Sequence, residues 1–144
     1  IVHRDISDSN IMYSRDDSRW KIIDLELAVH LPEGDDVFVD DCVVGTAGFI
    51  APEVTSSRTY SFSSDIWSFG MVSLRKMTDE IGIRDGEFRN DRRLRSVFDA
   101  LVLFSMSLMN QNPSLRPSPA DAIRSLTCIE QDLNQVHLQP CPMA

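Results

Sequence analysis

Three polar side chains near the start of the chain have the types and spacing that phosphate chemistry requires. Asp5 and Asn10 stand five residues apart, and Asp24 follows fourteen residues after Asn10. Phosphoryl transfer from ATP needs a carboxylate that orients the acceptor hydroxyl, and oxygen ligands that hold magnesium on the phosphates. Asp5, Asn10 and Asp24 fit these three roles. The alternative, that they only build turns beside a hairpin, explains each residue alone but not their joint spacing.

A hairpin and a loop would position these residues. Residues 11–13 and 20–23 are apolar runs on either side of the polar cluster 14–18, which predicts two short strands joined by a turn and places Asp24 at the end of the second strand. Residues 29–59 show neither helical nor strand periodicity and are interrupted by glycine and proline. They predict one long loop, and loops of this length are usually functional or disordered.

Helical patterns occupy the rest of the chain. Residues 66–74 are apolar nearly all round, which predicts a buried helix capped at Ser63 or Ser64 and ending near the cations Arg75 and Lys76.

Two further helices are expected after this one. Apolar residues at spacings of three and four predict a helix over residues 94–109, and Ser118 caps another that continues to Val136. We therefore predict a mainly α-helical fold with a small β-hairpin.

The composition excludes several classes of function. The chain of 144 residues carries a formal charge of -8, and residues 22–57 alone contain eight acids and no Lys or Arg. This balance argues against binding to nucleic acid or to an anionic membrane. The most apolar stretch, residues 100–109, is too short to span a bilayer. Three widely spaced cysteines and no leader sequence predict a cytoplasmic or nuclear protein with reduced thiols.

The residues from His3 to Asn10 resemble the H-R-D-x-x-x-x-N catalytic loop of protein kinases, and residues 24–26 stand where that family has D-F-G. The resemblance implies that Asp5 is the catalytic base and that Asn10 and Asp24 bind Mg²⁺ and thereby ATP. Aminoglycoside- and choline-kinase-like enzymes are a competing family, since they share an H-x-D-x-x-x-x-N loop and an I-D-W-E-like metal motif.

Later motifs favour the protein kinases. Residues 44–53 resemble G-T-x-x-Y-x-A-P-E, residues 64–70 resemble S-D-x-W-S-x-G, and residues 112–117 resemble D-P-x-x-R-P. The first of these closes the family's activation segment, here residues 24–53, which small-molecule kinases lack.

The same motifs imply roles for single residues. The resemblance adds Arg4 and Thr46 to the catalytic set of Asp5, because the family places Thr46 against the catalytic loop. It also implies that Glu53 pairs with Arg116 and that Asp65 braces the catalytic loop.

We therefore expect residues 1–136 to form the C-terminal lobe of the α+β protein-kinase fold, with residues 137–144 as a disordered tail. The family's glycine-rich loop, ATP-anchoring lysine and partner glutamate are not found in the sequence, and in the family they precede the catalytic loop. Because the chain opens at Ile1 with no lead-in, we expect an N-terminal lobe upstream and no activity from this chain alone. The resemblance implies a protein substrate, phosphorylated on Ser or Thr rather than Tyr.

Three departures from the family pattern affect this interpretation. Ser7 and Ser9 stand where Ser/Thr kinases carry a lysine and tyrosine kinases often carry an arginine, so no local cation steadies the transferred phosphate. Glu26 replaces the glycine of D-F-G, and either adds a metal ligand or points to solvent. These departures support the alternative of a pseudokinase that uses the lobe as a binding surface. An acid in the glycine position is also similar to the fungal-type protein kinases.

The third departure concerns regulation. Thr46 is the only Ser, Thr or Tyr between Asp24 and Glu53, so the usual phosphorylation site within the segment is missing. We hypothesise that acids of the segment pair with Arg4 in place of a phosphate. The alternative is a solvated acidic loop. The acids concerned are Glu33, Asp35, Asp36, Asp40 and Asp41.

Overall fold

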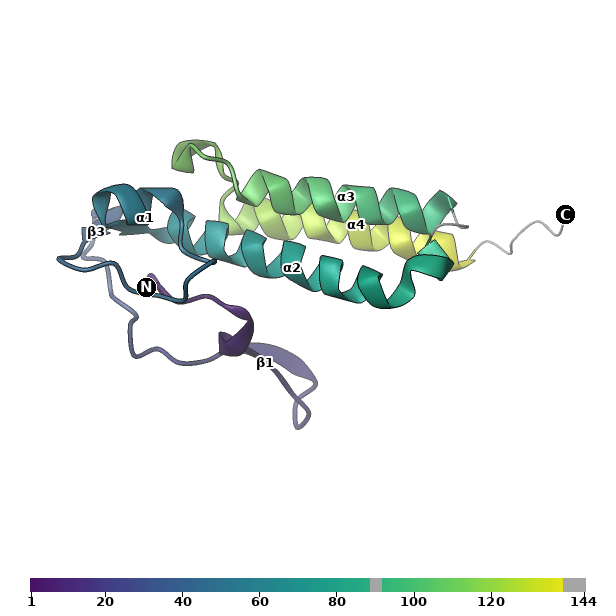
Figure 1. The fold of residues 1–144 in the computed structure, drawn as a ribbon, viewed down its shortest axis with the longest axis horizontal. Helices are drawn as coiled ribbons and strands as arrows, with labels where there is room; N and C mark the ends of the chain where they lie inside the picture. The colour runs from purple at the N-terminus through teal and green to yellow at the C-terminus, as the bar shows by residue number, and fades with distance from the viewer. Residues whose placement is uncertain (89–91, 139–144) are drawn as a thin grey trace, which may run out of the picture.

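Three long helices form the body of the molecule in the computed structural model, which describes residues 1–88 and 92–138, with side chains at 1–79 and 95–131. α2 (Phe62–Phe88), α3 (Arg92–Leu108) and α4 (Pro119–Leu138) lie side by side along the long axis (Figure 1). The smaller elements are η1 (Asp8–Asn10), β1 (Ile11–Ser14), β2 (Arg19–Ile22), β3 (Val37–Val39), α1 (Pro52–Ser57), β4 (Thr59–Ser61) and η2 (Pro113–Leu115). About half of the chain is helical, so the predicted mainly α-helical fold is confirmed.

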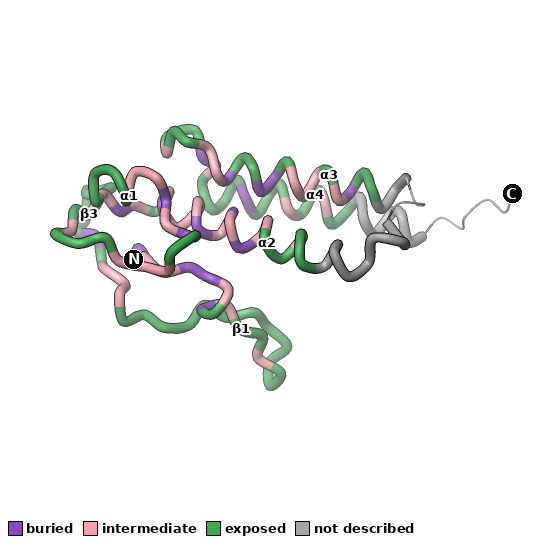
Figure 2. Tube along the Cα trace, in the orientation of Figure 1, coloured by how far each residue is buried: buried purple, intermediate pink, exposed green. Residues whose placement is uncertain are grey.

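The predicted hairpin is formed by β1 and β2. The two strands are antiparallel, with Ile11 opposite Ile22 and Tyr13 opposite Trp20, and the turn passes through Ser18 at φ 53°. The rings of Tyr13 and Trp20 meet edge to face with centroids 5.4 Å apart. Figure 2 shows that the hairpin projects from the body of the molecule and is largely exposed.

The prediction of one long loop over residues 29–59 is wrong. β3 pairs antiparallel with β4, which sets Phe38 opposite Tyr60, and α1 begins with Pro52 at its first position and ends at Arg58 in the left-handed region, φ 55°. A strand of three residues is too short to show periodicity, and its partner lies about twenty residues away along the chain. Proline at the first helical position was the available signal for α1.

The expected end of the first long helix is also wrong. α2 passes through Arg75 and Lys76 and continues to Phe88. No proline interrupts this stretch, so nothing in the sequence stops the helix where the two cations stand. Both cations therefore lie in the middle of the helix and not at its C-terminal end.

A glycine allows α2 and α3 to approach closely. A Cβ at Gly70 would lie 2.7 Å from Met109 Cγ and 2.9 Å from Leu108 Cβ. Any larger residue would force the two helices apart, since atoms do not approach so closely without a shift of the backbone.

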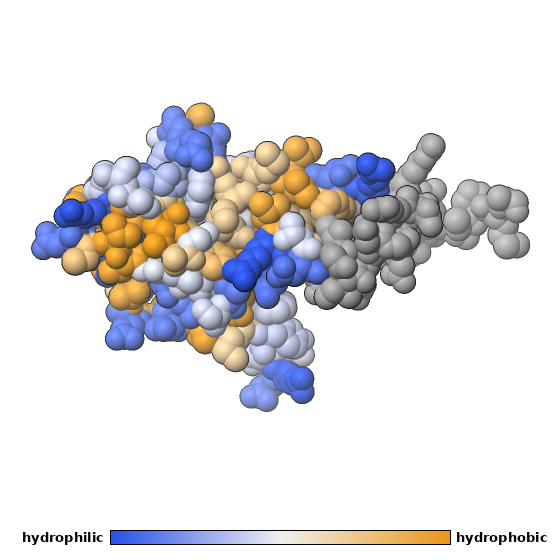
Figure 3. Space-filling view, in the orientation of Figure 1, coloured by the Kyte–Doolittle hydropathy of each residue, from blue (hydrophilic) through white to orange (hydrophobic). Residues whose placement is uncertain are grey.

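Three buried clusters hold the elements together. Two of them join the N-terminal segment and the activation segment to α2, and the third lies between α3 and α4. Their buried members are Val2, Leu31, Ala51, Val54 and Tyr60 in the first cluster, Ile6, Phe49 and Val72 in the second, and Phe104, Leu108 and Ala122 in the third. Figure 3 shows that apolar residues also reach the surface at the end that carries β3 and α1, and over α3.

α4 begins with the predicted cap. Ser118 Oγ accepts a hydrogen bond from the Asp121 N–H at 3.2 Å and donates to Asp121 Oδ2 at 2.6 Å. The helix reaches Leu138, and residues 139–144 of the expected tail lie outside the described residues. No helix in the described part of the chain combines the length and apolarity needed to cross a membrane.

Candidate active site

The carboxylate of Asp5 is held by donors from two segments. Thr46 donates to Oδ1 through both its N–H and its hydroxyl, each at 2.6 Å, and Asn10 Nδ2 donates to Oδ2 at 2.8 Å. Asn10 Nδ2 also lies 2.9 Å from the Asp5 carbonyl, to which it donates. The activation segment and the catalytic loop, residues 3–10, therefore fix the orientation of Asp5 together.

Asp65 braces the catalytic loop from the first turn of α2, as the motif predicts. Its Oδ2 accepts from the His3 N–H at 2.7 Å, and its Oδ1 accepts from the Arg4 N–H at 3.0 Å. Burial raises the pKa of Asp65, while the two N–H donors lower it in part. Arg4 has φ 69°, a strained conformation for a residue with a side chain, and these bonds help to hold it.

Backbone contacts bring Asp24 to the same end of the molecule. The Ile23 N–H donates to the Asn10 carbonyl at 2.9 Å, and His3 Nε2 donates to the Ile23 carbonyl at 3.1 Å. His3 Nδ1 accepts from the Asp5 N–H at 3.3 Å, which agrees with a proton on Nε2. Asp24 follows at φ 64° and is exposed, and among the described residues its carboxylate makes no hydrogen bond to Asp5 or Asn10.

The donor set suits a magnesium ion held partly by phosphates. Asn10 uses its amide nitrogen toward Asp5, so its amide oxygen is available, and Asp24 accepts only one long hydrogen bond, from the Glu26 N–H at 3.3 Å. Amide and carboxylate oxygens are the ligands that Mg²⁺ prefers, with phosphates completing its shell. Among the described side chains, no three His, Cys, Asp or Glu form a cluster that could hold a metal by themselves.

The hypothesis that an acid pairs with Arg4 agrees with the structure for one of the five acids. Arg4 Nη1 lies 2.5 Å from Asp40 Oδ2, and Arg4 Nε donates to the Leu27 carbonyl at 2.5 Å. The guanidinium also lies 5.2 Å from the ring centroid of Phe38 and 5.0 Å from that of Tyr60. The hydrogen bond from Arg4 lowers the pKa of Asp40 below its usual value.

A buried ion pair closes the activation segment. Arg116 donates to both carboxylate oxygens of Glu53, at 2.6 and 2.8 Å, and to the carbonyls of Ser63 and Asn110, both at 2.8 Å. The Arg116 side chain has no exposed surface, and its guanidinium lies 4.9 Å from the Trp67 ring centroid. The predicted pair is confirmed, and every polar group of Arg116 acts inside the lobe.

The surroundings of Ser7 contain a contact that the sequence did not indicate. Ser7 is buried, and its hydroxyl lies 2.9 Å from that of Ser9, so neither residue supplies a cation. Arg75 of α2 forms an ion pair with Asp8, with 3.2 Å between Nε and Oδ2, and its guanidinium lies 5.8 Å from the ring centroid of Phe49. The pattern of residues suggested only a cation at a helix end.

The structure thus brings Asp5, Asn10 and Thr46 together by direct hydrogen bonds, and joins Asp24 to them through the backbone. Arg4 precedes Asp5 in the chain, but its side chain bonds Asp40 and the Leu27 carbonyl. Glu26 is exposed, and its hydrogen bond to Asp24 comes from its backbone N–H. Tyr60 was not anticipated, because no motif includes it and a single tyrosine carries no periodic signal.

Comparisons with known proteins agree with this arrangement. The family model described as the protein kinase domain matches residues 1–128. The chain is 35% identical over 118 residues to the probable serine/threonine-protein kinase PBL28 of Arabidopsis thaliana, covering 81% of this chain and 29% of that protein. It is 29% identical over 154 residues to the probable serine/threonine-protein kinase PBL5 of the same plant, covering 88% and 36%.

A third relative is named a receptor protein-tyrosine kinase, CEPR2 of Arabidopsis thaliana, at 34% identity over 153 residues, covering 88% of this chain and 15% of that protein. The chain therefore spans about a third or less of the length of these relatives. The match to the family model over most of its residues shows that the chain belongs to the protein kinase domain family.

Proposed function

We propose that the protein containing this chain transfers the γ-phosphate of ATP to a Ser or Thr hydroxyl of a protein substrate. The observation that carries the proposal is the Asp5 carboxylate, held by Asn10 and Thr46 in a fixed orientation. Relatives named serine/threonine-protein kinases support the choice of acceptor. An assignment to the fungal-type subfamily stays a prediction.

Each residue has a role in this reaction. Asp5 accepts the hydrogen bond of the acceptor hydroxyl and orients its oxygen toward the phosphate, as the catalytic-loop Asp does in phosphoryl transfer. The amide oxygen of Asn10 and the carboxylate of Asp24 would hold Mg²⁺. When bound, this ion neutralises negative charge on the phosphates. Thr46 ties the activation segment to Asp5, so an ordered segment and an oriented Asp5 form together.

The full-length protein tests this proposal. We expect it to phosphorylate a generic protein substrate with Mg²⁺ and ATP, and Asp5→Asn to lower kcat about 10²–10⁴-fold, the usual contribution of a positioned acid or base. Asp17→Asn is the matched control, because Asp17 is an exposed acid that pairs with Lys21 on the hairpin. Unchanged kcat in Asp5→Asn would contradict the proposal.

We also propose that the 144-residue chain alone does not turn over ATP. Its described residues supply acceptor-orienting and metal-binding groups, whereas the family's ATP-anchoring lysine and glycine-rich loop belong to a part of the fold that this chain does not contain. Phosphorylation of a protein substrate by the isolated chain would contradict this.

A pseudokinase is a second candidate, favoured by the buried Ser7, whose hydroxyl contacts Ser9 where the family places a cation. Magnesium-dependent nucleotide binding by the full-length protein without phosphate transfer would support it. A small-molecule kinase is disfavoured, because the chain has a complete activation segment ending in Ala51-Pro52-Glu53.

We further propose that the ion pair of Arg4 with Asp40 keeps the activation segment ordered without phosphorylation. The acid stands on the segment itself, so a covalent phosphate is not needed to reach the arginine. Loss of activity after phosphatase treatment of the full-length kinase would argue against this.

A further inference from the structure

We infer that Tyr60 is a positioning residue for the phosphoryl-transfer reaction, and that it acts by holding the backbone of Val44 so that Thr46 reaches Asp5. The inference rests on the proposed kinase function and names a residue that none of the sequence motifs contains.

The hydroxyl of Tyr60 is bonded to the activation segment. Tyr60 lies on β4 and is 1% exposed. Its oxygen accepts from the Val44 N–H at 2.6 Å and lies 3.2 Å from the Val44 carbonyl, with the Cys42 carbonyl at 3.4 Å as the other acceptor for its proton. A buried hydroxyl that both accepts and donates fixes the peptide groups on either side of Val44, because each loses a partner if the chain shifts.

The ring of Tyr60 contacts the catalytic loop. Its centroid lies 5.0 Å from the Arg4 guanidinium, on which Phe38 also packs. Tyr60 therefore contacts the residue that precedes Asp5 and the residue two positions before Thr46. Tyr60 thus joins Arg4 of the catalytic loop to the backbone of Val44 in the activation segment.

Only Gly45 separates Val44 from Thr46, so a shift of the Val44 backbone also shifts Thr46. Gly45 has φ 113°, and a Cβ there would lie 2.6 Å from the Arg4 carbonyl, so this backbone packs directly on the catalytic loop. Thr46 then makes its two bonds to Asp5 at 2.6 Å. A shift of Val44 is therefore passed to the donors that orient the carboxylate.

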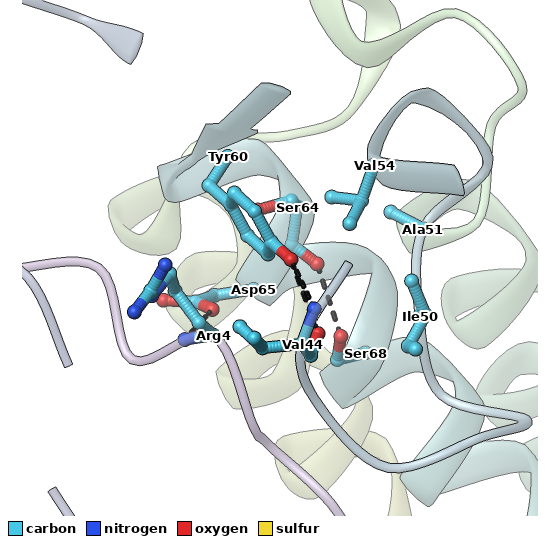
Figure 4. Close-up of a pocket in the computed structure, with 9 residues that line it drawn as sticks. All are labelled: Arg4, Val44, Ile50, Ala51, Val54, Tyr60, Ser64, Asp65 and Ser68. Atoms are coloured by element: carbon cyan, nitrogen blue, oxygen red, sulfur yellow. Dashed lines mark hydrogen bonds between the residues drawn. The ribbon is translucent and has the colours of Figure 1, made fainter. Parts of the chain in front are cut away.

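A small cavity lies beside Tyr60. Figure 4 shows Tyr60, Arg4 and Val44 around a cavity whose other walls include Asp65 and Ser68 of α2. Val44 also packs against the buried cluster that contains Tyr60, and the hydrogen bonds of the Tyr60 hydroxyl add direction to this packing. Ser68 Oγ makes a similar bond, to the Phe49 carbonyl at 2.7 Å.

Tyr60→Phe in the full-length kinase tests the inference, since it removes the hydroxyl and keeps the ring. We expect kcat for a generic protein substrate to fall about 10-fold to 100-fold, the effect of a small misplacement of reacting groups, while KM for ATP stays unchanged. Tyr13→Phe is the matched control, because the other tyrosine of the chain is half-exposed on the hairpin and its hydroxyl makes no hydrogen bond within the described residues. Its kcat should equal that of the wild type.

A double-mutant cycle separates positioning from a general loss of structure. Thr46→Val removes the hydroxyl that bonds Asp5 and keeps the N–H donor. If Tyr60 acts through the Thr46 hydroxyl, Tyr60→Phe should change kcat less than about 2-fold in this background, since coupled residues are not additive. A full additional 10-fold loss there would overturn the route through the Thr46 hydroxyl.

The outcomes distinguish this inference from the proposed function. Equal kcat for wild type and Tyr60→Phe would overturn the positioning role alone, whereas an inactive wild-type enzyme would overturn the proposed function. Hydrogen exchange gives a readout that does not depend on the variant folding: the Val44 amide of the wild-type protein should exchange slowly, and rapid exchange would show that the hydroxyl does not hold it.

Discussion

Two neighbouring regions of the site differ in how firmly the chain holds them. The anchored region, residues 3–10 and 37–68, contains Asp5 with three donors, the brace of Asp65 and the ion pair of Arg4. The open region, residues 11–26, comprises the hairpin and the metal motif, and nearly all of its residues are exposed. Trp20 is 69% exposed and Leu25 63%.

The anchored region contains the group proposed to orient the acceptor, and the open region contains Asp24, the proposed metal ligand. The groups proposed to orient the acceptor are positioned by the fold of this chain, because Thr46, distant in sequence, bonds the Asp5 carboxylate. Asp24, which would bind the metal, has only a local hydrogen bond. Its final position therefore depends on the ion and the nucleotide, which supply the remaining ligands. In physical terms the acceptor half of the site is preorganised and the nucleotide half is not.

The largest effect is expected at the ion pair that closes the anchored region. Arg116→Leu leaves the carboxylate of Glu53 without its partner, and breaking one side of a buried pair costs about 3–5 kcal/mol of unfolding free energy. Urea unfolding of the full-length protein measures this. The control is Lys21→Leu, which breaks the exposed pair with Asp17 in the open region and should have no measurable effect. Equal stability of both variants would contradict the distinction between the regions.

A comparison of Asp5, the proposed acceptor-orienting acid, with Asp24, the proposed metal ligand, sharpens the contrast. Asp5→Ala and Asp24→Ala should both abolish most activity. Asp5→Ala should also lower the unfolding free energy by about 1–3 kcal/mol, since the donors of Asn10 and Thr46 lose their acceptor. Asp24→Ala should leave stability unchanged because the residue is exposed. Thermal unfolding of both variants checks this, and a loss of stability in Asp24→Ala would show that the open region is held more firmly than its contacts indicate.

The sequence predicted those parts of the site in which a motif fixes both partners. Glu53 with Arg116, and Asp65 with the catalytic loop, could be named in advance because each contact joins two motif residues. The hairpin and the cap at Ser118 followed from local patterns. β3 could not be predicted, since three residues show no period and its pairing with β4 is set by tertiary folding.

The sequence also could not predict which of the five acids of the activation segment pairs with Arg4. All of them follow Arg4 by 29 to 37 residues in the sequence, but only Asp40 comes directly after β3, which pairs with β4 and so ends beside the arginine. Tyr60 was missed for the same reason, because its position opposite Phe38 follows from that pairing. Which residues meet in a contact between irregular segments is set by the path of the backbone, so the composition alone does not predict it.

Asp40→Asn tests the ion pair of Arg4 with Asp40 in the anchored region through the pH dependence of stability. Because the pKa of Asp40 is lowered in the folded protein, its contribution to stability is present above the unfolded value of about 3.9 and is lost as the pH falls through the lower folded value. The variant should lose activity severalfold at neutral pH, and its stability should fall less steeply below about pH 4. Parallel pH profiles of stability for wild type and variant would contradict the pairing.

The smallest effect is expected in the open region. Trp20→Ser removes the ring that meets Tyr13 edge to face, but both rings are exposed, so little buried area is lost. We expect the unfolding free energy of the full-length protein to change by less than about 1 kcal/mol, within the range of an exposed aromatic pair. Urea unfolding monitored by circular dichroism measures this change, because the variant loses the Trp20 fluorescence signal. A loss of several kcal/mol would mean that the hairpin supports the helices, and the division into an anchored and an open region would then be wrong.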